Sequence, residues 1–157
     1  MKQFAVIGDP IAHSLSPILH QEVYRQLGID ASFEKIHLMP NAFHSFMNVN
    51  ELDGFNVTIP YKQSVIPFLD ELDESAQTIG AVNCVHDGKG YNTDWIGFTT
   101  AMEQNGISLN GKDCIILGSG GAARAIAFGL VKFGAKSISI KNRTQSKADK
   151  LLHWING

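Results

Sequence analysis

Three glycines between an apolar run and a helical pattern could bind the phosphates of a dinucleotide. Residues 114–117 are apolar and predict a buried strand, and residues 122–133 repeat apolar side chains every three or four positions, which predicts a helix. The turn between them consists of Gly118, Ser119, Gly120 and Gly121. A helix that begins directly after such a turn offers free N–H groups and a partial positive charge to phosphate. An ordinary tight turn between a strand and a helix is the alternative.

The small residues of this stretch have distinct roles in the dinucleotide pattern. Gly118 permits the tight turn, Gly120 lets the backbone approach a pyrophosphate, and Ala123 packs the helix on the strand. We therefore expect the cofactor's phosphates at the start of this helix, against the glycine turn and Ala122.

Basic residues follow the next predicted strand, residues 137–140, and suggest which dinucleotide is bound. In a site for NAD, an acidic residue about 20 positions after the glycines binds the ribose 2′-hydroxyl. Arg143 and Lys147 stand there instead, and a guanidinium grips a 2′-phosphate where a carboxylate would repel it. We therefore expect NADP. The alternative is a helix capped by Thr144 with a solvated first turn, although cations there oppose the helix dipole.

A second group of polar residues follows predicted strands in the first half of the chain. Ser14 stands on the loop after a strand at residues 2–8, and Thr58 and Lys62 stand at the end of a strand at residues 54–59. In a mostly parallel sheet, ligands bind at the carboxyl ends of strands. These side chains therefore predict a ligand site, with a solvated lysine as the alternative reading of Lys62.

Each of three further polar residues allows two interpretations, a structural role and a functional role. Ser16 is suited to cap a helix that begins at Pro17 and runs to about Leu27, which leaves the hydroxyl of Ser14 freer to meet a ligand. Asp94 is suited either to cap a helix that runs to Gln104 or to a role in the site. Asn83 falls inside a predicted strand at residues 81–86, where a buried amide needs partners that a polyhydroxy ligand would supply.

Predicted strands and helices alternate along the chain, which indicates an α/β fold with a mostly parallel sheet. Helices are expected at residues 40–48 and 70–80, and a hairpin turn at Asp87 and Gly88. Turn-forming residues near 105–112 divide the chain into domains 1–109 and 110–157. The second domain would hold only the first half of a Rossmann-type sheet.

Composition excludes several classes of protein. The chain has 157 residues, of which 44% are hydrophobic, so it can bury a core. A net charge of −2 disfavours nucleic acid or an anionic membrane as the main partner. The chain has no long apolar run, no signal-peptide pattern and no metal-ligand spacing. Cys84 and Cys114 both fall in predicted strands, which favours buried thiols in a reducing cytoplasm.

Six motifs follow one another along the chain: GDPIAHSLSP at residues 8–17, NVTIPYK at 56–62, GAVN at 80–83, YNTDWIGF at 91–98, the glycine turn and NRT at 142–144. In this order they resemble the motifs of the shikimate dehydrogenases. The resemblance covers essentially the whole chain. It implies an N-terminal shikimate-binding domain, a Rossmann-type NADP domain, and the NADPH-dependent reduction of 3-dehydroshikimate to shikimate in chorismate and aromatic amino-acid biosynthesis.

The resemblance also implies a role for each matching residue. Shikimate would be bound by Ser14, Ser16, Thr58, Lys62, Asn83 and Asp94, and NADP by the glycine turn with Asn142, Arg143, Thr144 and Lys147. Lys62 would be the catalytic acid and base, oriented by Asp94. A monomer or homodimer would be expected.

Two departures from the family bear on activity. Cys84 stands where the family usually has threonine, which we expect to change packing only. Family members are also much longer, so we expect an incomplete form whose first domain folds, whose second is marginal, and which alone shows no turnover. A quinate/shikimate dehydrogenase, a non-catalytic fragment that binds shikimate or nucleotide, and a purely structural fragment are the alternatives.

Overall fold

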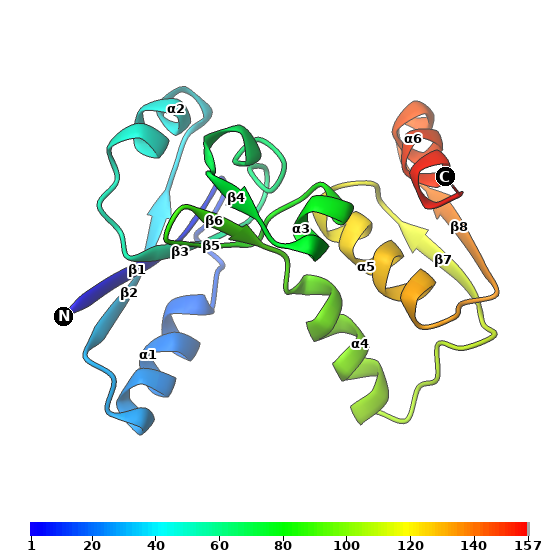
Figure 1. Ribbon diagram of the computed structural model, residues 1–157, viewed down its shortest axis with the longest axis horizontal. Helices are drawn as coiled ribbons and strands as arrows, with labels where there is room; N and C mark the ends of the chain where they lie inside the picture. The colour runs from blue at the N-terminus through cyan, green and yellow to red at the C-terminus, as the bar shows by residue number, and fades with distance from the viewer. Residues whose placement is uncertain (157) are drawn as a thin grey trace. The chain divides into compact units, whose positions relative to one another are not determined.

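The structure is a computed structural model that describes residues 1–156, and the chain divides into two compact units (Figure 1). The first unit combines Met1–Gln77 with Val82–Tyr91. The second combines Thr78–Ala81 with the described residues from Asn92 onward. Each unit has an apolar core of its own.

A six-stranded sheet forms the centre of the first unit, in the order β2-β1-β3-β5-β6-β4. Its strands are β1 (Lys2–Gly8), β2 (Ala31–His37), β3 (Gly54–Val57), β4 (Glu71–Leu72), β5 (Cys84–His86) and β6 (Lys89–Tyr91). Strands β2 and β3 pair with β1 in parallel, whereas β5 is antiparallel to β3 and to β6. The predicted α/β class is confirmed, and the carboxyl ends of β2, β1 and β3 meet at one edge.

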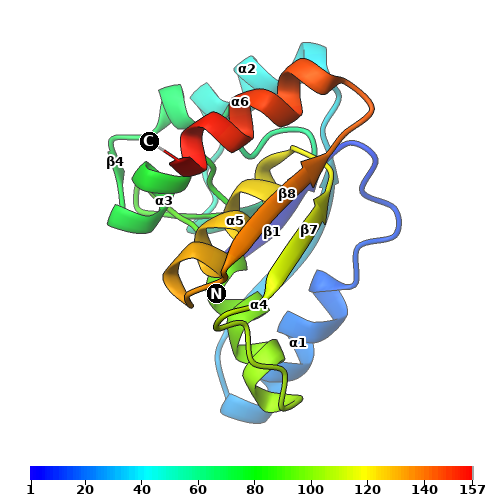
Figure 2. The same ribbon diagram turned by 90° about the vertical axis from the view of Figure 1, so that its right-hand side faces the viewer.

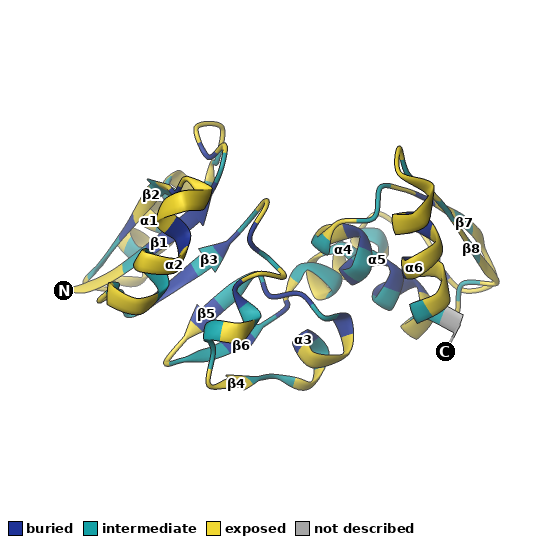
Figure 3. Cartoon of the chain, turned by 90° about the horizontal axis from the view of Figure 1, so that it is seen from above, coloured by how far each residue is buried: buried dark blue, intermediate teal, exposed yellow. Residues whose placement is uncertain are grey.

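Helices α1 (Ser16–Leu27) and α2 (Pro40–Val49) cover opposite faces of this sheet (Figure 1). Successive side chains of a strand point to opposite faces. Val6 of β1 therefore packs with Phe33 and Tyr24 on the α1 side, whereas Ile7 packs with Phe43 of α2. Burial on both faces explains the apolar run in the second half of β1, whose last four residues are buried and dark blue in Figure 3.

The boundaries before helix α3 (Glu74–Ile79) differ from those expected from the sequence. The helix expected from residue 70 begins only at Glu74, because the carboxylate of Asp73 accepts hydrogen bonds from the N–H groups of Ser75 (3.2 Å) and Ala76 (2.9 Å). An aspartate in this position caps a helix start. Glu71 and Leu72, which were expected to be helical, form β4 and pair with β6.

Tight turns end two elements of the first unit as predicted. Gly28 adopts a left-handed conformation (φ 64°) and terminates α1. Asp87 and Gly88 both have positive φ (49° and 71°) between β5 and β6, the conformation of a two-residue hairpin turn.

The second unit is built on β7 (Asp113–Leu117) and β8 (Ser137–Lys141), which pair in parallel. Figure 2 shows these strands side by side, with helix α5 (Gly121–Lys132) behind them. Helix α6 (Gln145–Asn156) follows β8, and residues of both helices share a core with Ile116. The other face of β7 is open, since Ile115 and Leu117 are 65% and 80% exposed.

Helix α4 (Asp94–Gln104) belongs to the second unit, because Phe98 and Met102 pack into the core that Ile116 and Leu109 occupy. The compact units thus differ from the predicted domains 1–109 and 110–157, which placed this helix in the first domain. Where the functional boundary between substrate and cofactor domains lies stays a prediction.

Within residues 1–156 no helix is long and apolar enough to cross a membrane, and no group of His, Cys, Asp and Glu side chains could hold a metal ion. Cys84 and Cys114 are free thiols, and both are partly buried rather than buried as expected. Burial nevertheless raises the pKa of the Cys84 thiol, which keeps it protonated at neutral pH.

Candidate functional site

The loops after β1 and β3 are joined at the carboxyl edge of the first sheet. Thr58 follows β3 directly, and its N–H donates to the carbonyl of Ile7 in β1 (3.0 Å). In return the N–H of Asp9, which follows β1, donates to the carbonyl of Ile59 (2.9 Å). The loop that leads to Ser14 therefore begins beside Thr58, at the edge where the sequence indicated a ligand site.

Neither serine of the first loop has the structural role expected from the sequence, and Ser16 is not the N-cap. Ser16 is the first helical residue of α1, and the residue in the capping position is Leu15, which makes no side-chain cap. The Oγ of Ser14 accepts a hydrogen bond from the N–H of Ser16 (3.3 Å), and the two hydroxyls are 3.2 Å apart. The prediction that Ser14 has no structural role is therefore wrong, because its hydroxyl supports the helix start. Both serines are half-buried.

Lys62 and Asn83 reach the same edge through backbone hydrogen bonds. The carbonyl of Lys62 accepts from the N–H of Val82 (2.7 Å), and the carbonyl of Asn83 accepts from the N–H of Val57 (2.8 Å). The N–H of Asn83 donates to the carbonyl of Tyr91 (2.9 Å). Asn83 lies just before β5, not inside a strand as expected, and is half-buried. The structure thus brings both residues together with Thr58.

Supporting contacts that the sequence analysis missed hold the first loop. His37, the last residue of β2, lies 2.7 Å from Asp9 through Nε2 and Oδ1. Lys35 donates from Nζ to the carbonyl of Ala12 (3.0 Å). Asp9 stands within the GDPIAHSLSP motif, but its partners come from another strand, so only three-dimensional information identifies them.

Tyr61 anchors the turn that carries Lys62. Its ring stacks on Phe43 of α2 (centroids 4.3 Å apart), and its hydroxyl donates to the carbonyl of Leu38 (2.5 Å). Burial, together with the negative charge of Asp9, raises the pKa of Tyr61, so the phenol remains a donor. A rigid residue therefore precedes the proposed catalytic lysine.

Asp94 lies in the second unit, at the first position of α4. It is not the N-cap, which is Thr93, so the capping alternative is wrong. Its N–H donates to Oδ1 of Asn92 (3.1 Å), and Nδ2 of Asn92 donates to the carbonyl of Ala81 (2.8 Å). Asn92 is almost fully buried and was missed by the sequence analysis, although it belongs to the YNTDWIGF motif. An interaction between Asp94 and Lys62 stays a prediction.

The glycine turn has the backbone that phosphate binding requires. Gly118 has φ 124°, a conformation that other residues rarely adopt, and its N–H donates to the carbonyl of Lys141 (2.8 Å). Gly120 precedes α5 without a side-chain cap, and a Cβ added there would meet no atom within 4 Å. Ala123 is buried against the β7 core, as predicted. The first N–H groups of α5 therefore face space that an anion could occupy.

The predicted 2′-phosphate residues follow β8, next to the glycine turn. Leu117 and Lys141 are register partners, so the loops that follow them leave adjacent strands. Nδ2 of Asn142 donates to the carbonyl of Thr144 (2.9 Å), which shapes the second loop. Arg143, Thr144 and Lys147 are exposed there, accessible to a ligand.

Comparison with known proteins gives consistent relatives for both halves. Residues 6–85 match the family described as "Shikimate dehydrogenase substrate binding domain", and residues 100–157 match "Shikimate / quinate 5-dehydrogenase". The chain is 43% identical to a shikimate dehydrogenase (NADP(+)) of Staphylococcus aureus over 92% of its length, and 44% identical to that of Nitrosopumilus maritimus over 98%. It spans 57% and 59% of those relatives.

A solved structure agrees with these relatives. The shikimate 5-dehydrogenase of Thermus thermophilus, in complex with NADP(H) and shikimate, superposes with a TM-score of 0.89 at 38% identity, covering 99% of this chain and 61% of that one. The fold predicted from the sequence, an N-terminal substrate domain followed by the start of a nucleotide-binding domain, is thereby confirmed. Because the substrate-domain family alone matches residues 6–85, about half of the chain, the chain belongs to the shikimate dehydrogenase family.

Proposed function

We propose that this chain forms the shikimate-binding part and the first nucleotide-binding part of an NADP-dependent shikimate dehydrogenase. The observation that carries the proposal is the set of backbone hydrogen bonds that gathers Thr58, Lys62 and Asn83 at one sheet edge. Hydroxyl, ammonium and amide groups there suit a small carbocyclic acid that carries several hydroxyls. The loop that begins at this edge leads to Ser14 and Ser16, whose hydroxyls would bind further hydroxyls of the ligand.

Lys62 is proposed as the group that moves the proton. In reduction, its ammonium donates a proton to the ketone oxygen of 3-dehydroshikimate as the carbonyl carbon receives a hydride. In oxidation, its amine accepts that proton from the hydroxyl of shikimate. The anchored Tyr61 before it and the hydrogen bond to its carbonyl hold the backbone, so the side chain approaches the substrate from a fixed point.

The residues of the second unit fit a 2′-phosphorylated dinucleotide. The uncapped start of α5 and the open space at Gly120 would hold the pyrophosphate. Arg143, with Asn142, Thr144 and Lys147, would hold the 2′-phosphate. NADPH, when bound, supplies the hydride. Asp94 is proposed to orient Lys62, and the cytoplasm as the compartment of the protein stays a prediction.

A quinate/shikimate dehydrogenase is the closest alternative, since the family matched by residues 100–157 carries both names. The two substrates differ in ring unsaturation and in one hydroxyl. Binding of both with similar affinity would favour this alternative. Binding of shikimate by the chain without turnover by the chimaera would favour a non-catalytic module.

The test has a binding arm and a turnover arm. Calorimetry measures shikimate, quinate and adenosine 2′,5′-bisphosphate against the 157-residue chain. A chimaera, in which these residues are joined to the remaining length of the Staphylococcus aureus relative, is assayed for shikimate-dependent NADPH formation. We expect shikimate and the bisphosphate to bind the chain and the chimaera to turn over. A folded chain that binds neither probe at millimolar concentration contradicts the proposal.

A further inference from the structure

His20 of α1 lies where the helix meets the sheet, and none of the roles assigned above uses it. Its ring stacks on Phe33 of β2, with centroids 4.0 Å apart and planes within 5°. Tyr24, one helical turn further on, contacts it at 5.8 Å. Its Nε2 lies 3.4 Å from Nδ2 of Asn56 in β3. The ring therefore touches its own helix and two strands of the first unit.

The contact between His20 and Asn56 joins two elements that carry proposed substrate residues. Ser16 precedes His20 by one turn of α1, and Thr58 stands two residues after Asn56, directly beyond the end of β3. The other described side-chain hydrogen bond from α1 to the sheet runs from Gln21 to the carbonyl of Phe33 in β2. Among the described contacts, the hydrogen bond of His20 is thus the polar link between the serine helix and the threonine strand.

We propose that His20 is a positioning residue of the substrate site, which fixes Ser16 relative to Thr58 by accepting a hydrogen bond from Asn56. The inference rests on the proposed function, because it assumes that these two hydroxyls bind shikimate together. Hydroxyl donors on separate elements recognise a rigid ring only when their spacing is held. The stacking on Phe33 holds the imidazole plane, and the Asn56 amide then sets the distance from helix to strand.

The role requires a neutral imidazole, because only an unprotonated ring nitrogen accepts from an amide N–H. Burial lowers the pKa of His20 below its usual value of 6.5, which favours that form. Around the ring, α1 supplies Tyr24, β2 supplies Phe33 and β3 supplies Asn56; Tyr24 alone of these titrates, and burial raises its pKa.

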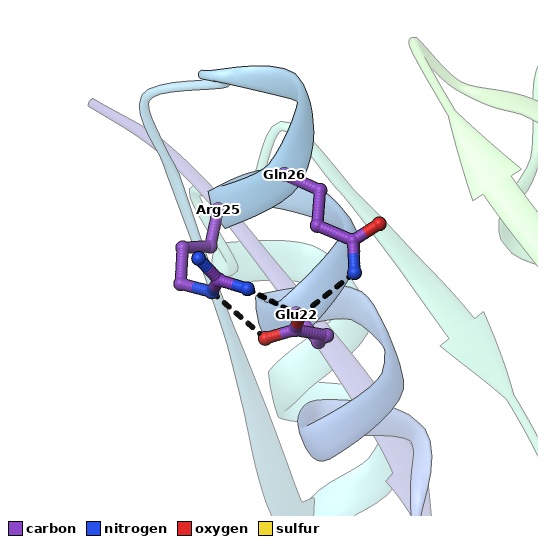
Figure 4. A network of polar contacts seen from close by, with 3 residues as sticks. All are labelled: Glu22, Arg25 and Gln26. Atoms are coloured by element: carbon purple, nitrogen blue, oxygen red, sulfur yellow. Dashed lines mark hydrogen bonds and ion pairs between the residues drawn. The ribbon is translucent and has the colours of Figure 1, made fainter.

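The nearest acidic residue along the helix is already paired. Glu22 of α1 accepts hydrogen bonds from Arg25 (2.6 and 2.9 Å) and from Gln26 (2.8 Å), as Figure 4 shows. Arg25 also lowers the pKa of Glu22, so the carboxylate stays ionised within this exposed group. The protonation state of His20 is therefore set by its burial.

Two substitutions separate positioning from simple packing. His20→Phe keeps a ring that can stack on Phe33 but removes the acceptor. His20→Gln removes the ring but keeps an oxygen that can accept from Asn56. Calorimetry with shikimate and the full 157-residue chain should show affinity roughly threefold to tenfold weaker for His20→Phe, the usual worth of one hydrogen bond, and little change for His20→Gln.

The pH dependence provides a readout that packing does not move. Between about pH 8 and 5.5, affinity of the unaltered chain should fall as His20 protonates below its ordinary pKa, while affinity of the glutamine variant should stay flatter. His44→Phe is the matched control, because His44 belongs to α2, on the opposite face of the sheet from α1. Its ring centroid lies 5.1 Å from that of Phe68, and its Nδ1 lies 3.0 Å from Nδ2 of Asn48. Its substitution should leave shikimate affinity unchanged.

The outcomes distinguish this inference from the proposed function. Loss of affinity in the glutamine variant with retention in the phenylalanine variant would show that stacking alone matters and would overturn the inference, as would equal affinities in all chains or equal losses in both variants. An unaltered, folded chain that does not bind shikimate would instead overturn the proposed function, and this inference with it.

Discussion

Lys62 combines a fixed backbone with a side chain that is only half-buried. The turn before it closes through a hydrogen bond from the N–H of Tyr61 to the carbonyl of Thr58 (2.9 Å), and its own carbonyl is bound by Val82. The backbone contacts fix the point from which the side chain reaches, and partial exposure lets its ammonium exchange protons with solvent. The catalytic role of Lys62, against the solvated lysine that is the alternative, stays a prediction.

Substitution of this lysine should therefore affect the chemical step more than binding. In the chimaera, Lys62→Ala should lower kcat by about 10²–10⁴-fold, the usual contribution of a positioned acid and base. The KM for shikimate should change much less, and Lys35→Ala, which removes a loop contact instead, serves as the comparison. An unchanged kcat with a raised KM would make Lys62 a binding residue only.

Arg143 allows the cofactor preference to be tested at a single residue. Replacing it by aspartate removes the proposed partner of the 2′-phosphate and adds repulsion, so kcat/KM for NADP should fall relative to that for NAD. The measurement is the ratio of the two kcat/KM values in the chimaera before and after Arg143→Asp. If the ratio stays constant, the 2′-phosphate is bound elsewhere, and Lys147→Asp then tests the neighbouring cation.

Single residues also show what sequence patterns can and cannot predict. The glycine turn was predictable because φ 124° at Gly118 is a local requirement that only glycine meets easily. The assignment of Ser14 failed because a preference for serine near a helix start does not say which of two nearby serines accepts the hydrogen bond. Ser14, two residues before the first residue of α1, accepts it from the N–H of Ser16. Contacts such as that between Asp9 and His37 join separate strands, and no local pattern encodes them.

Helices and strands were predicted well wherever burial imposes a period. The run in β1 is apolar on both faces, and β7, the glycine turn and α5 follow the expected order. The boundary of α3 was missed because no glycine or proline marks it in residues 70–79, whereas tertiary pairing with β6 draws Glu71 and Leu72 into β4. Helix α4, expected as a bridge between the domains and assigned to residues 1–109, packs in the second compact unit, because its apolar side chains do not specify which core they join.

The start of α3 gives a prediction about stability. Asp73→Ala removes the acceptor for the N–H groups of Ser75 and Ala76 and should lower the free energy of unfolding by about 0.5–2 kcal/mol. Urea denaturation followed by circular dichroism measures it. Asp30→Ala is the control, since Asp30 is exposed and makes a surface ion pair with the N-terminus (3.3 Å), a contact of little expected value. Equal midpoints for the two variants would show that the cap contributes nothing.

The molecule as a whole combines one well-enclosed sheet with one open sheet. In the first unit, β1 and β3 lie between helices and are buried on both faces. In the second unit, β7 pairs with β8 on one edge, and among the described residues no strand pairs with its other edge. Ile115 and Leu117 are largely exposed on this strand. Exposed apolar side chains beside an unpaired strand edge favour association with another chain.

This contrast predicts the behaviour of a polypeptide that consists of these 157 residues alone. It should bind shikimate through the first unit, but it should show no shikimate-dependent formation of NADPH. Hydride transfer needs the reacting atoms held closely, and a misplacement of about 1 Å can cost roughly 10²-fold. An open two-stranded sheet supplies the glycine turn but no opposing strand to enclose the nicotinamide.

The absorbance of NADPH, recorded with shikimate and NADP, measures turnover, and the chimaera is the positive control. Light scattering of the same samples reports association through β7, which Ile115→Lys should reduce. A rate on the order of 1 s⁻¹ or more from the 157-residue polypeptide would show that two strands suffice, or that a second copy of the chain completes the nucleotide site.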